Sequence, residues 1–157
     1  MIKIKKILCP VDFFPGAEHA VNFATGLAAV HHAKVYLLHV VAPMIPGPYA
    51  DGISTVDITE SLERAALRQM TQLVGKVKAR GVRAQGTVMH GQVRDVIDRV
   101  MSDLKPDLIT MGTHNRSSIE RWFMGSVTEW LIRHSTVPVL TVGPKSAKKA
   151  RITKRAA

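Results

Sequence analysis

Cysteine is almost absent from this sequence of 157 residues, which contains only Cys9. A single cysteine can form neither an internal disulfide nor a thiol cluster that binds a metal. Cys9 lies in an apolar run, and an activated thiol needs a partly exposed, electropositive site. We therefore expect a buried, unreactive side chain.

Long hydrophobic runs are also absent. Apolar residues make up 46% of the chain, yet no run approaches the roughly 18 residues that a membrane-spanning helix needs. The charged start, residues 1–7, lacks the apolar core and the small-residue cleavage site of a secretory signal. Because both features are missing, we expect a cytoplasmic protein. The length predicts one domain.

Two well-known phosphate-binding patterns are missing as well. There is no Gly-x-x-x-x-Gly-Lys-Ser/Thr loop, and no Gly-x-Gly-x-x-Gly follows a predicted strand, which argues against a P-loop enzyme or an ordinary dehydrogenase. The seven histidines show neither zinc spacing nor a pairing with serine and an acid. We expect no metal site, no catalytic residues, and ATP hydrolysis that is slow or absent.

Acidic residues are scarce, and the C-terminal segment has none. The chain carries 22 Lys and Arg against 12 Asp and Glu, a net charge of +10. We expect residues 1–144 to form the domain and residues 145–157 to form a disordered basic tail. Such a tail can attract nucleic acid. The alternative is a solvated extension, which the lack of interleaved aromatic residues favours.

Apolar runs and helical periods alternate along the rest of the chain. Strands are predicted at 7–12, 34–41, 82–88, 107–111 and 137–142, and the alternating pattern of 82–88 suits a sheet edge. Helices are predicted at 17–31, 57–80, 93–104 and 126–134. This alternation predicts an α/β, Rossmann-like fold: a single-domain, doubly wound, five-stranded parallel sheet flanked by four helices.

Two predicted features lie where an open sheet binds ligands. A Pro- and Gly-rich loop, 42–57, follows the second strand, and Asp57 and Glu60 indicate an N-terminal cap after it. The last helix begins with Ser126 and Glu129, which fit a capping box. Its N–H groups and positive dipole end can hold an anion such as phosphate.

Several segments together resemble the universal stress protein family in order, spacing and element type. They are Ile7 to Asp12, Leu37 to Val41, Gly112-Thr113-His114-Asn115 followed after nine residues by Gly125-Ser126, and His134 to Leu140. The family's nucleotide-binding branch carries Gly, two residues, Gly, nine residues, Gly, then Ser or Thr. The resemblance implies a dimeric stress-response or regulatory protein that binds ATP or another adenine nucleotide, with or without Mg.

The resemblance also implies the position of the nucleotide. Asp12 would contact the adenosine part beside Pro10 and Val11, and Val40 or Val41 would line the adenine slot. The remaining implied contacts are Met111, Gly112, Thr113, His114, Asn115, Arg116, Gly125, Ser126, Val127 and Thr128.

Some of these residues also have a purely structural interpretation. Asp12 can be an acid that ends a strand and caps the next turn. Ser126 can serve the capping box alone, although a capping hydroxyl can still donate its own proton to phosphate. Gly112 and Gly125 can be ordinary turn glycines rather than points of close approach to a ligand.

Two residues depart from the family's pattern. Asn115 replaces the second glycine of the motif. The change adds a side chain, but asparagine is among the few residues that tolerate a left-handed backbone conformation. The alternative function is therefore a member that has lost nucleotide binding and acts through protein contacts. Phe14 stands where many relatives have a serine that caps the first helix, so we expect that cap to be affected but the fold to be kept.

The last predicted strand, Val137 to Val142, is expected to lie at a sheet edge. It is short and apolar on both faces, with Pro138 near its start and Thr141 as its polar residue. Such an edge favours pairing with a second chain. We expect a homodimer joined through this strand, with Trp130 or Leu131 adding apolar contact.

Overall fold

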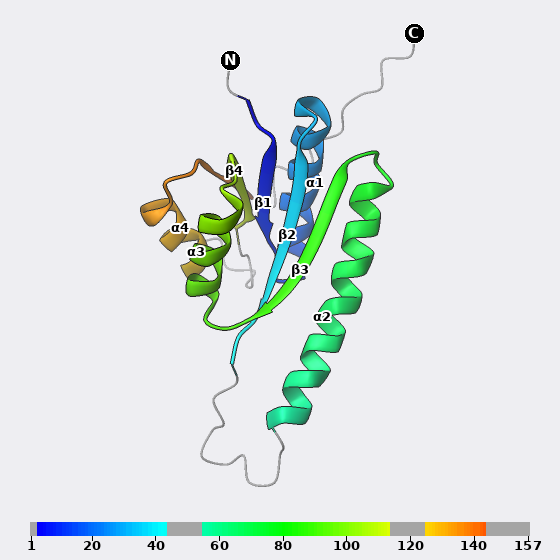
Figure 1. Ribbon diagram of the computed structural model, residues 1–157, viewed down its shortest axis with the longest axis vertical. Helices are drawn as coiled ribbons and strands as arrows, with labels where there is room; N and C mark the ends of the chain where they lie inside the picture. The colour runs from blue at the N-terminus through cyan, green and yellow to red at the C-terminus, as the bar shows by residue number, and fades with distance from the viewer. Residues whose placement is uncertain (1–2, 44–54, 114–124, 144–157) are drawn as a thin grey trace.

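The computed structural model describes residues 3–43, 55–113 and 125–143 of the chain (Figure 1). The predicted basic tail therefore lies outside the described residues. In chain order the elements are β1 (Lys6–Pro10), α1 (Pro15–His31), β2 (Lys34–Val41), α2 (Thr55–Lys78), β3 (Arg83–His90), α3 (Val93–Leu104), β4 (Leu108–Gly112), α4 (Ser126–His134) and β5 (Val139–Val142). Within the described chain, no helix is long and apolar enough to cross a membrane.

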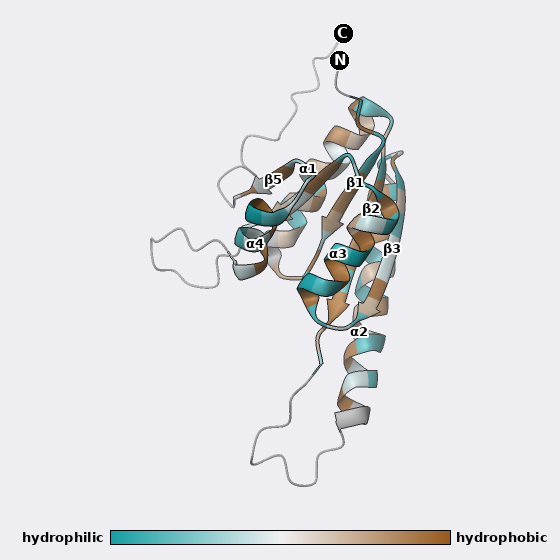
Figure 2. Ribbon diagram, turned by 60° about the vertical axis from the view of Figure 1, so that its left-hand side comes forward, coloured by the Kyte–Doolittle hydropathy of each residue, from teal (hydrophilic) through white to brown (hydrophobic). Residues whose placement is uncertain are grey.

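The strands form one parallel sheet in the order β3-β2-β1-β4-β5, which confirms the predicted fold. Helices α1 and α2 cover one face, and α3 and α4 cover the other (Figure 2). The first crossover places β2 beside β1, and a later one places β4 on the opposite side of β1. The order thus reverses between β1 and β4, and open sheets bind ligands at the carboxyl ends of the strands at such a point.

Each face of the sheet has its own apolar core. Small residues on α1, among them Ala20, Ala24 and Ala28, are fully or almost fully buried against the sheet, so this helix packs closely. On the other face, Ile97 of α3 and Leu131 of α4 pack against the buried Ile109 of β4. The apolar sides of α1, α3 and α4 therefore face the sheet.

Gly86 shows how closely α2 packs against the edge strand β3. A Cβ placed on Gly86 would lie 2.5 Å from Met70 Cγ and 2.8 Å from Val74 Cγ2, both side chains of α2. The glycine therefore lets α2 pack directly on the edge strand.

Several predicted helix and strand ends are wrong. Helix α2 begins at Thr55, so Asp57 lies inside the helix rather than at a cap. Strand β1 ends at Pro10 and strand β5 begins at Val139, each two residues inside its predicted range. Helix α1 begins at Pro15 and, as expected, no hydrogen bond from the side chain of Phe14 caps it.

The predicted capping box of α4 is also wrong. Gly125 is the N-cap residue, its carbonyl oxygen accepts the N–H of Glu129 at 3.0 Å, and no described side chain caps this end. Ser126 is the first helical residue instead. The carboxylate of Glu129 accepts a hydrogen bond from Arg133 Nη2 at 2.9 Å, one turn along the helix, so it does not reach back to the cap.

The burial expected for Cys9 is confirmed. Its side chain is fully buried in the core of the α1 face, and burial raises the pKa of the thiol to about 12. The hydroxyl of Thr110 lies beside the thiol and lowers this pKa by less, without the geometry of an ordinary hydrogen bond.

Candidate functional site

A cavity of about 410 Å³ opens at the carboxyl ends of β1, β2 and β4, beside the N-terminal ends of α3 and α4. It lies at the point where the strand order reverses, and its volume falls in the usual range of small-molecule sites. Its lining residues are Pro10, Val11, Asp12, Phe14, Ala17, Leu38, His39, Val40, Val93, Ile97, Met111, Gly112, Gly125, Ser126, Val127 and Thr128.

Most of the described residues in the predicted site meet in this cavity. Ten of them line it: Pro10, Val11, Asp12, Val40, Met111, Gly112, Gly125, Ser126, Val127 and Thr128. Gly112 and Gly125 are far apart in sequence, but β4 and α4 bring them to one wall. The fold therefore brings together the two described parts of the glycine and serine motif.

The remaining predicted residues do not line the cavity or are not described. Val40 lines the cavity, whereas the next residue, Val41, is buried and does not line it. Thr113 donates its N–H to the carbonyl oxygen of Val142 at 3.0 Å and so continues the pairing of β4 with β5. His114 and residues 115–116 lie outside the described residues.

Sequence reasoning missed several lining residues. Phe14 is the N-cap residue of α1 and Ala17 lies in its first turn, whereas Leu38 and His39 belong to β2, and Val93 and Ile97 to α3. A signal was available for His39, because it stands beside Val40 in a strand that was assigned to the site. The α3 residues gave no comparable signal, since their helical stripe predicts only packing against the sheet.

The turn between β1 and α1 forms one wall of the cavity. Asp12 Oδ1 accepts the backbone N–H of Phe14 at 3.0 Å, so the turn-capping interpretation of Asp12 is correct. Asp12 also lines the cavity, so the observed cap does not exclude a ligand contact. Phe13 has a φ of 60°, in the left-handed region that side chains rarely adopt.

His39 supports this turn from β2. Its Nδ1 lies 2.8 Å from the carbonyl oxygen of Val11, and its ring centroid lies 4.4 Å from that of Phe13. His39 thus contacts the turn twice: its ring packs on Phe13, and its Nδ1 forms a hydrogen bond with Val11. The shape of this wall therefore depends on β2 as well as on the turn itself.

The charges around the cavity suit a ligand that combines an apolar part with an anion. Asp12 is the acidic residue in the lining, and no described lysine or arginine lines it. An anion would therefore be held by the N–H groups and positive dipole end of α4, where Gly125 and Ser126 lie. Among the described residues, no group of three His, Cys, Asp or Glu could hold a metal ion.

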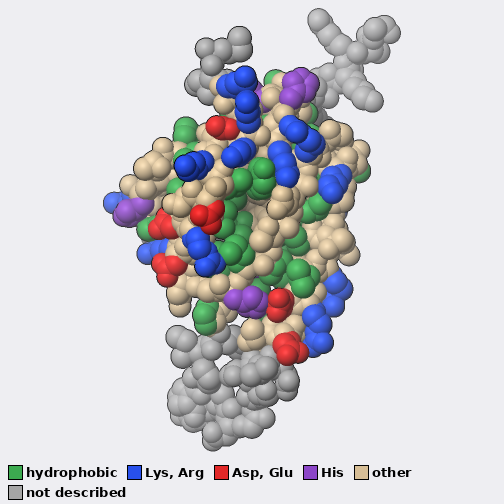
Figure 3. Space-filling model, in the orientation of Figure 1, with side chains coloured by type: hydrophobic (Ala, Val, Ile, Leu, Met, Phe, Trp, Pro, Cys, Tyr) green, Lys and Arg blue, Asp and Glu red, His purple; other side chains and the backbone are tan. Residues whose placement is uncertain are grey.

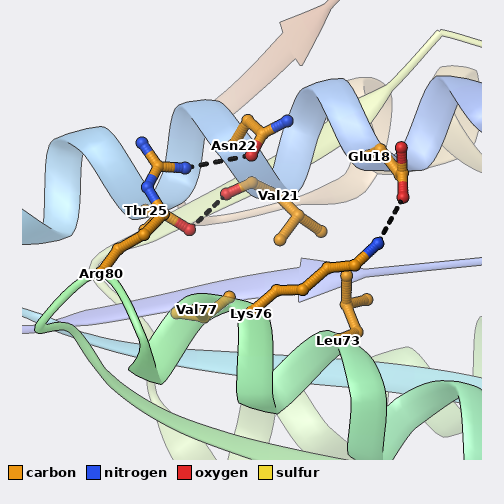
Figure 4. A pocket seen from close by; sticks show the side chains of 8 residues that line it. All are labelled: Glu18, Val21, Asn22, Thr25, Leu73, Lys76, Val77 and Arg80. Carbon is orange, nitrogen blue, oxygen red and sulfur yellow. Dashed lines mark hydrogen bonds and ion pairs between the residues drawn. The ribbon is translucent and has the colours of Figure 1, made fainter.

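A second cavity lies between α1 and α2 and is too small for a nucleotide (Figure 4). Its volume is about 130 Å³, below the usual range for ligand sites. Lys76 Nζ lies 3.1 Å from Glu18 Oε1, and Arg80 Nη1 donates to Asn22 Oδ1 at 3.0 Å. These contacts join the two helices, so this cavity is a packing feature.

Comparison with known proteins gives consistent matches over almost the whole chain. The universal stress protein family matches residues 3–143. Universal stress protein MJ0531 of Methanocaldococcus jannaschii is 31% identical over 147 residues, which are 92% of this chain and 84% of that protein.

Two solved structures are also similar to this chain. That of universal stress protein MJ0577 of the same organism superposes with a TM-score of 0.75 at 26% identity, covering 90% of this chain and 97% of that one. A universal stress protein family protein of Arabidopsis thaliana with AMP bound has a TM-score of 0.64 at 19% identity, covering 88% and 91%. At that identity the second similarity shows the fold alone.

Proposed function

This chain belongs to the universal stress protein family, and on that premise we propose that it binds an adenine nucleotide in the cavity at the carboxyl ends of β1, β2 and β4. The observation that carries the proposal is the composition of this cavity. Apolar side chains line most of it, one carboxylate lies at the turn after β1, and the N-terminal end of α4 faces it.

Each part of a nucleotide has a matching wall. Val11 and Val40 offer apolar surface to a base. Asp12 can accept hydrogen bonds from ribose hydroxyls or from an exocyclic amine, because an ionised carboxylate only accepts. The phosphates would meet the first turn of α4, where the exposed hydroxyl of Ser126 can add a donor.

The proposed role is that of a regulatory protein that responds to nucleotide, with slow or no hydrolysis. A protein of the same fold holds AMP, which supports a nucleoside phosphate as the ligand class. Asn115 lies outside the described residues, so a substitution at this position is needed to test its effect on phosphate binding. Replacing Asn115 by Gly should strengthen nucleotide binding if the asparagine side chain hinders close approach.

Calorimetry of the full chain with ATP, AMP and GTP tests the proposal directly. We expect adenine nucleotides to bind with a dissociation constant in the micromolar range or weaker, and GTP to bind less well. Protein purified without added nucleotide should release adenine nucleotide on denaturation. Absence of detectable binding by ATP and AMP would refute the proposal and favour a member that acts through protein contacts.

We also propose that the protein forms a homodimer through β5. This strand pairs with β4 on one side, and it is the last strand in the order of the described sheet. Val139, Leu140 and Thr141 are only half-buried in the single chain. An unpaired strand edge of this kind can pair with its own copy about a twofold axis.

A further inference from the structure

Three neighbouring strands each begin with a cation at the amino end of the sheet. Lys6 of β1 is in register with Lys34 of β2, and Lys34 is in register with Arg83 of β3. Neighbouring strands lie about 4.8 Å apart, so the three residues form a lateral row across the sheet. Like charges in directly opposite positions destabilise a sheet, so this row opposes folding.

The cationic groups of this row contact neutral partners. Lys6 Nζ donates to the carbonyl oxygen of Leu104 at 2.8 Å, and Lys34 Nζ donates to Gln85 Oε1 at 2.8 Å. Lys34 Nζ also lies 4.7 Å from the centroid of the Tyr36 ring. Arg83 Nη2 donates to the carbonyl oxygen of His32 at 3.0 Å. Within the described part of the chain, no carboxylate forms an ion pair with any of these three side chains, so the contacts orient them without neutralising them.

Further cations lie near the row along the chain. Lys105 directly follows Leu104, whose carbonyl oxygen Lys6 contacts. Arg80 lies three residues before Arg83, in the turn after α2, and its Nη1 donates to Asn22 Oδ1 of α1. Together with Lys5, these residues form what we call the basic rim: Lys5, Lys6, Lys34, Arg80, Arg83 and Lys105. Figure 3 shows Lys and Arg side chains gathered at this end of the molecule, whereas the Asp and Glu side chains in that view lie mostly in the middle and toward the other end.

One acid, Asp107, lies directly beside the row. Asp107 Oδ2 accepts the backbone N–H of Lys5 at 2.7 Å and that of Lys6 at 2.8 Å. This carboxylate therefore fixes the chain before β1 rather than pairing with a rim side chain. The exposed Asp103 of α3 lies two residues before Lys105. Among the described residues, the six rim cations therefore outnumber the two neighbouring acids, and the rim carries a net positive charge.

We propose that the basic rim binds the phosphate backbone of double-stranded nucleic acid. A duplex presents a negative charge about every 1.7 Å along its axis, which suits cations spaced a few ångströms apart. The rim offers no free aromatic face on which an unpaired base could stack, because Lys34 covers the ring of Tyr36. The contact is therefore with phosphates and independent of base sequence.

The rim lies at the amino ends of the strands, whereas the candidate nucleotide cavity lies at their carboxyl ends. The two surfaces can therefore be occupied together. The proposal does not rest on nucleotide binding in the cavity, and either one can fail without the other.

Fluorescence anisotropy with a labelled, random-sequence DNA duplex tests the rim on the full chain. The double variant Lys34→Gln/Arg83→Gln removes two rim charges. The matched control Arg68→Gln/Arg99→Gln removes two exposed charges from α2 and α3, so both proteins have the same net charge. We expect the rim variant to bind roughly tenfold more weakly or worse near 0.1 M salt, and the slope of log affinity against log salt to fall by about 2. The control should keep nearly the wild-type affinity and slope.

A charge-conserving variant separates the role of charge from that of folding. Lys34→Arg/Arg83→Lys should retain DNA binding, and circular dichroism should show every variant folded at the assay temperature. Equal loss of binding in the rim variant and its control would overturn the proposal, because net charge or the basic C-terminal segment would then explain binding. Equal or tighter binding of the wild type to polyglutamate or to anionic lipid vesicles would also overturn it, since the partner would not be a nucleic acid.

Discussion

His39 Nδ1 lies 2.8 Å from the carbonyl oxygen of Val11, and this contact joins β2 to the segment that leads into the turn before α1. A carbonyl oxygen only accepts, so Nδ1 must carry the proton in this hydrogen bond. This contact therefore selects a proton on Nδ1 of His39. The same ring packs on Phe13, whose left-handed backbone needs support from its surroundings.

The variant His39→Ala should therefore lose both stability and nucleotide affinity. It removes the hydrogen bond and the ring contact, and we expect a loss of about 1–3 kcal/mol in the free energy of unfolding. His39→Asn should lose less, because its amide can donate from nearly the same position. Urea unfolding and nucleotide titration measure the two effects.

His134 supplies a matched control for His39. Its Nδ1 lies 2.9 Å from the carbonyl oxygen of Trp130 and its ring stacks on that residue, but it is exposed at the end of α4 and away from the cavity. His134→Ala should leave nucleotide affinity unchanged. If His39→Ala also left nucleotide affinity unchanged, the turn would not depend on His39 for its binding shape.

Variants of Asp12 can separate its two roles. Asp12→Asn keeps a side-chain oxygen that can accept the N–H of Phe14, but it removes the negative charge from the cavity. We expect it to retain most of the wild-type stability and to bind adenine nucleotide more weakly. Asp12→Ala should lose stability as well, by about 1 kcal/mol, because the turn loses its cap. Equal nucleotide affinity in all three proteins would leave the turn as the sole role of Asp12.

Glycine substitutions in α2 and β3 should have opposite effects on stability. Gly86→Ala places a Cβ against Met70 and Val74, and we expect a loss of about 1–3 kcal/mol. Gly75 is a helical residue whose added Cβ would meet nothing within 4 Å, so Gly75→Ala should gain about 0.5–1 kcal/mol. Thermal unfolding compares the two. A neutral Gly86→Ala would show that α2 can shift away from β3 at little cost.

Cys9 should make stability fall at high pH. The pKa of its thiol is raised from 9.0 to about 12 in the folded protein, so the folded state binds more protons than the unfolded state between these values. Its contribution is complete below pH 9 and is lost as pH rises toward about 12, at up to about 1.4 kcal/mol per pH unit. Urea unfolding of the wild type and of Cys9→Ala across this range measures it. A parallel pH dependence in the two proteins would contradict the expected contribution.

The sequence was most informative where one interaction decides the local structure. Uninterrupted apolar runs predicted the central strands, because a strand buried on both faces needs apolar residues throughout. The alternating apolar and polar residues around Gly86 predicted an edge strand, because a strand with one less buried face needs apolar residues only on its other face. The left-handed backbone of Phe13 had no signal in the local sequence, and the ring it contacts, His39, lies 26 positions later in the printed chain.

The candidate site was predicted unevenly for a related reason. Residues next to strand ends, such as Val11 and Val40, were found because the ends of parallel strands meet at one edge of the sheet. Val93 and Ile97 were missed, because their place in the cavity depends on how α3 packs beside α4. The wrong capping box shows the same limit. By spacing, Glu129 can reach back to the N–H at the start of α4 or forward to Arg133, and in the structure it contacts Arg133.

The proposed dimer can be tested without disturbing the pairing of β5 with β4. The carbonyl oxygens of Pro138 and Val142 accept N–H groups of the β4 segment, at 2.9 Å and 3.0 Å. Because residues of a strand alternate in the direction of their backbone groups, the N–H of Thr141 points away from β4 toward the open edge.

Thr141→Pro removes that outward N–H and should therefore yield a folded monomer, since proline is tolerated where an edge strand does not donate to its neighbour. Thr141→Val keeps the N–H and should remain a dimer. Val142→Lys is a poor test, because Val142 is only 5% exposed and its replacement would disturb the core of the single chain. Sedimentation equilibrium that shows a monomeric wild type, or an undisturbed Thr141→Pro dimer, would refute pairing through β5.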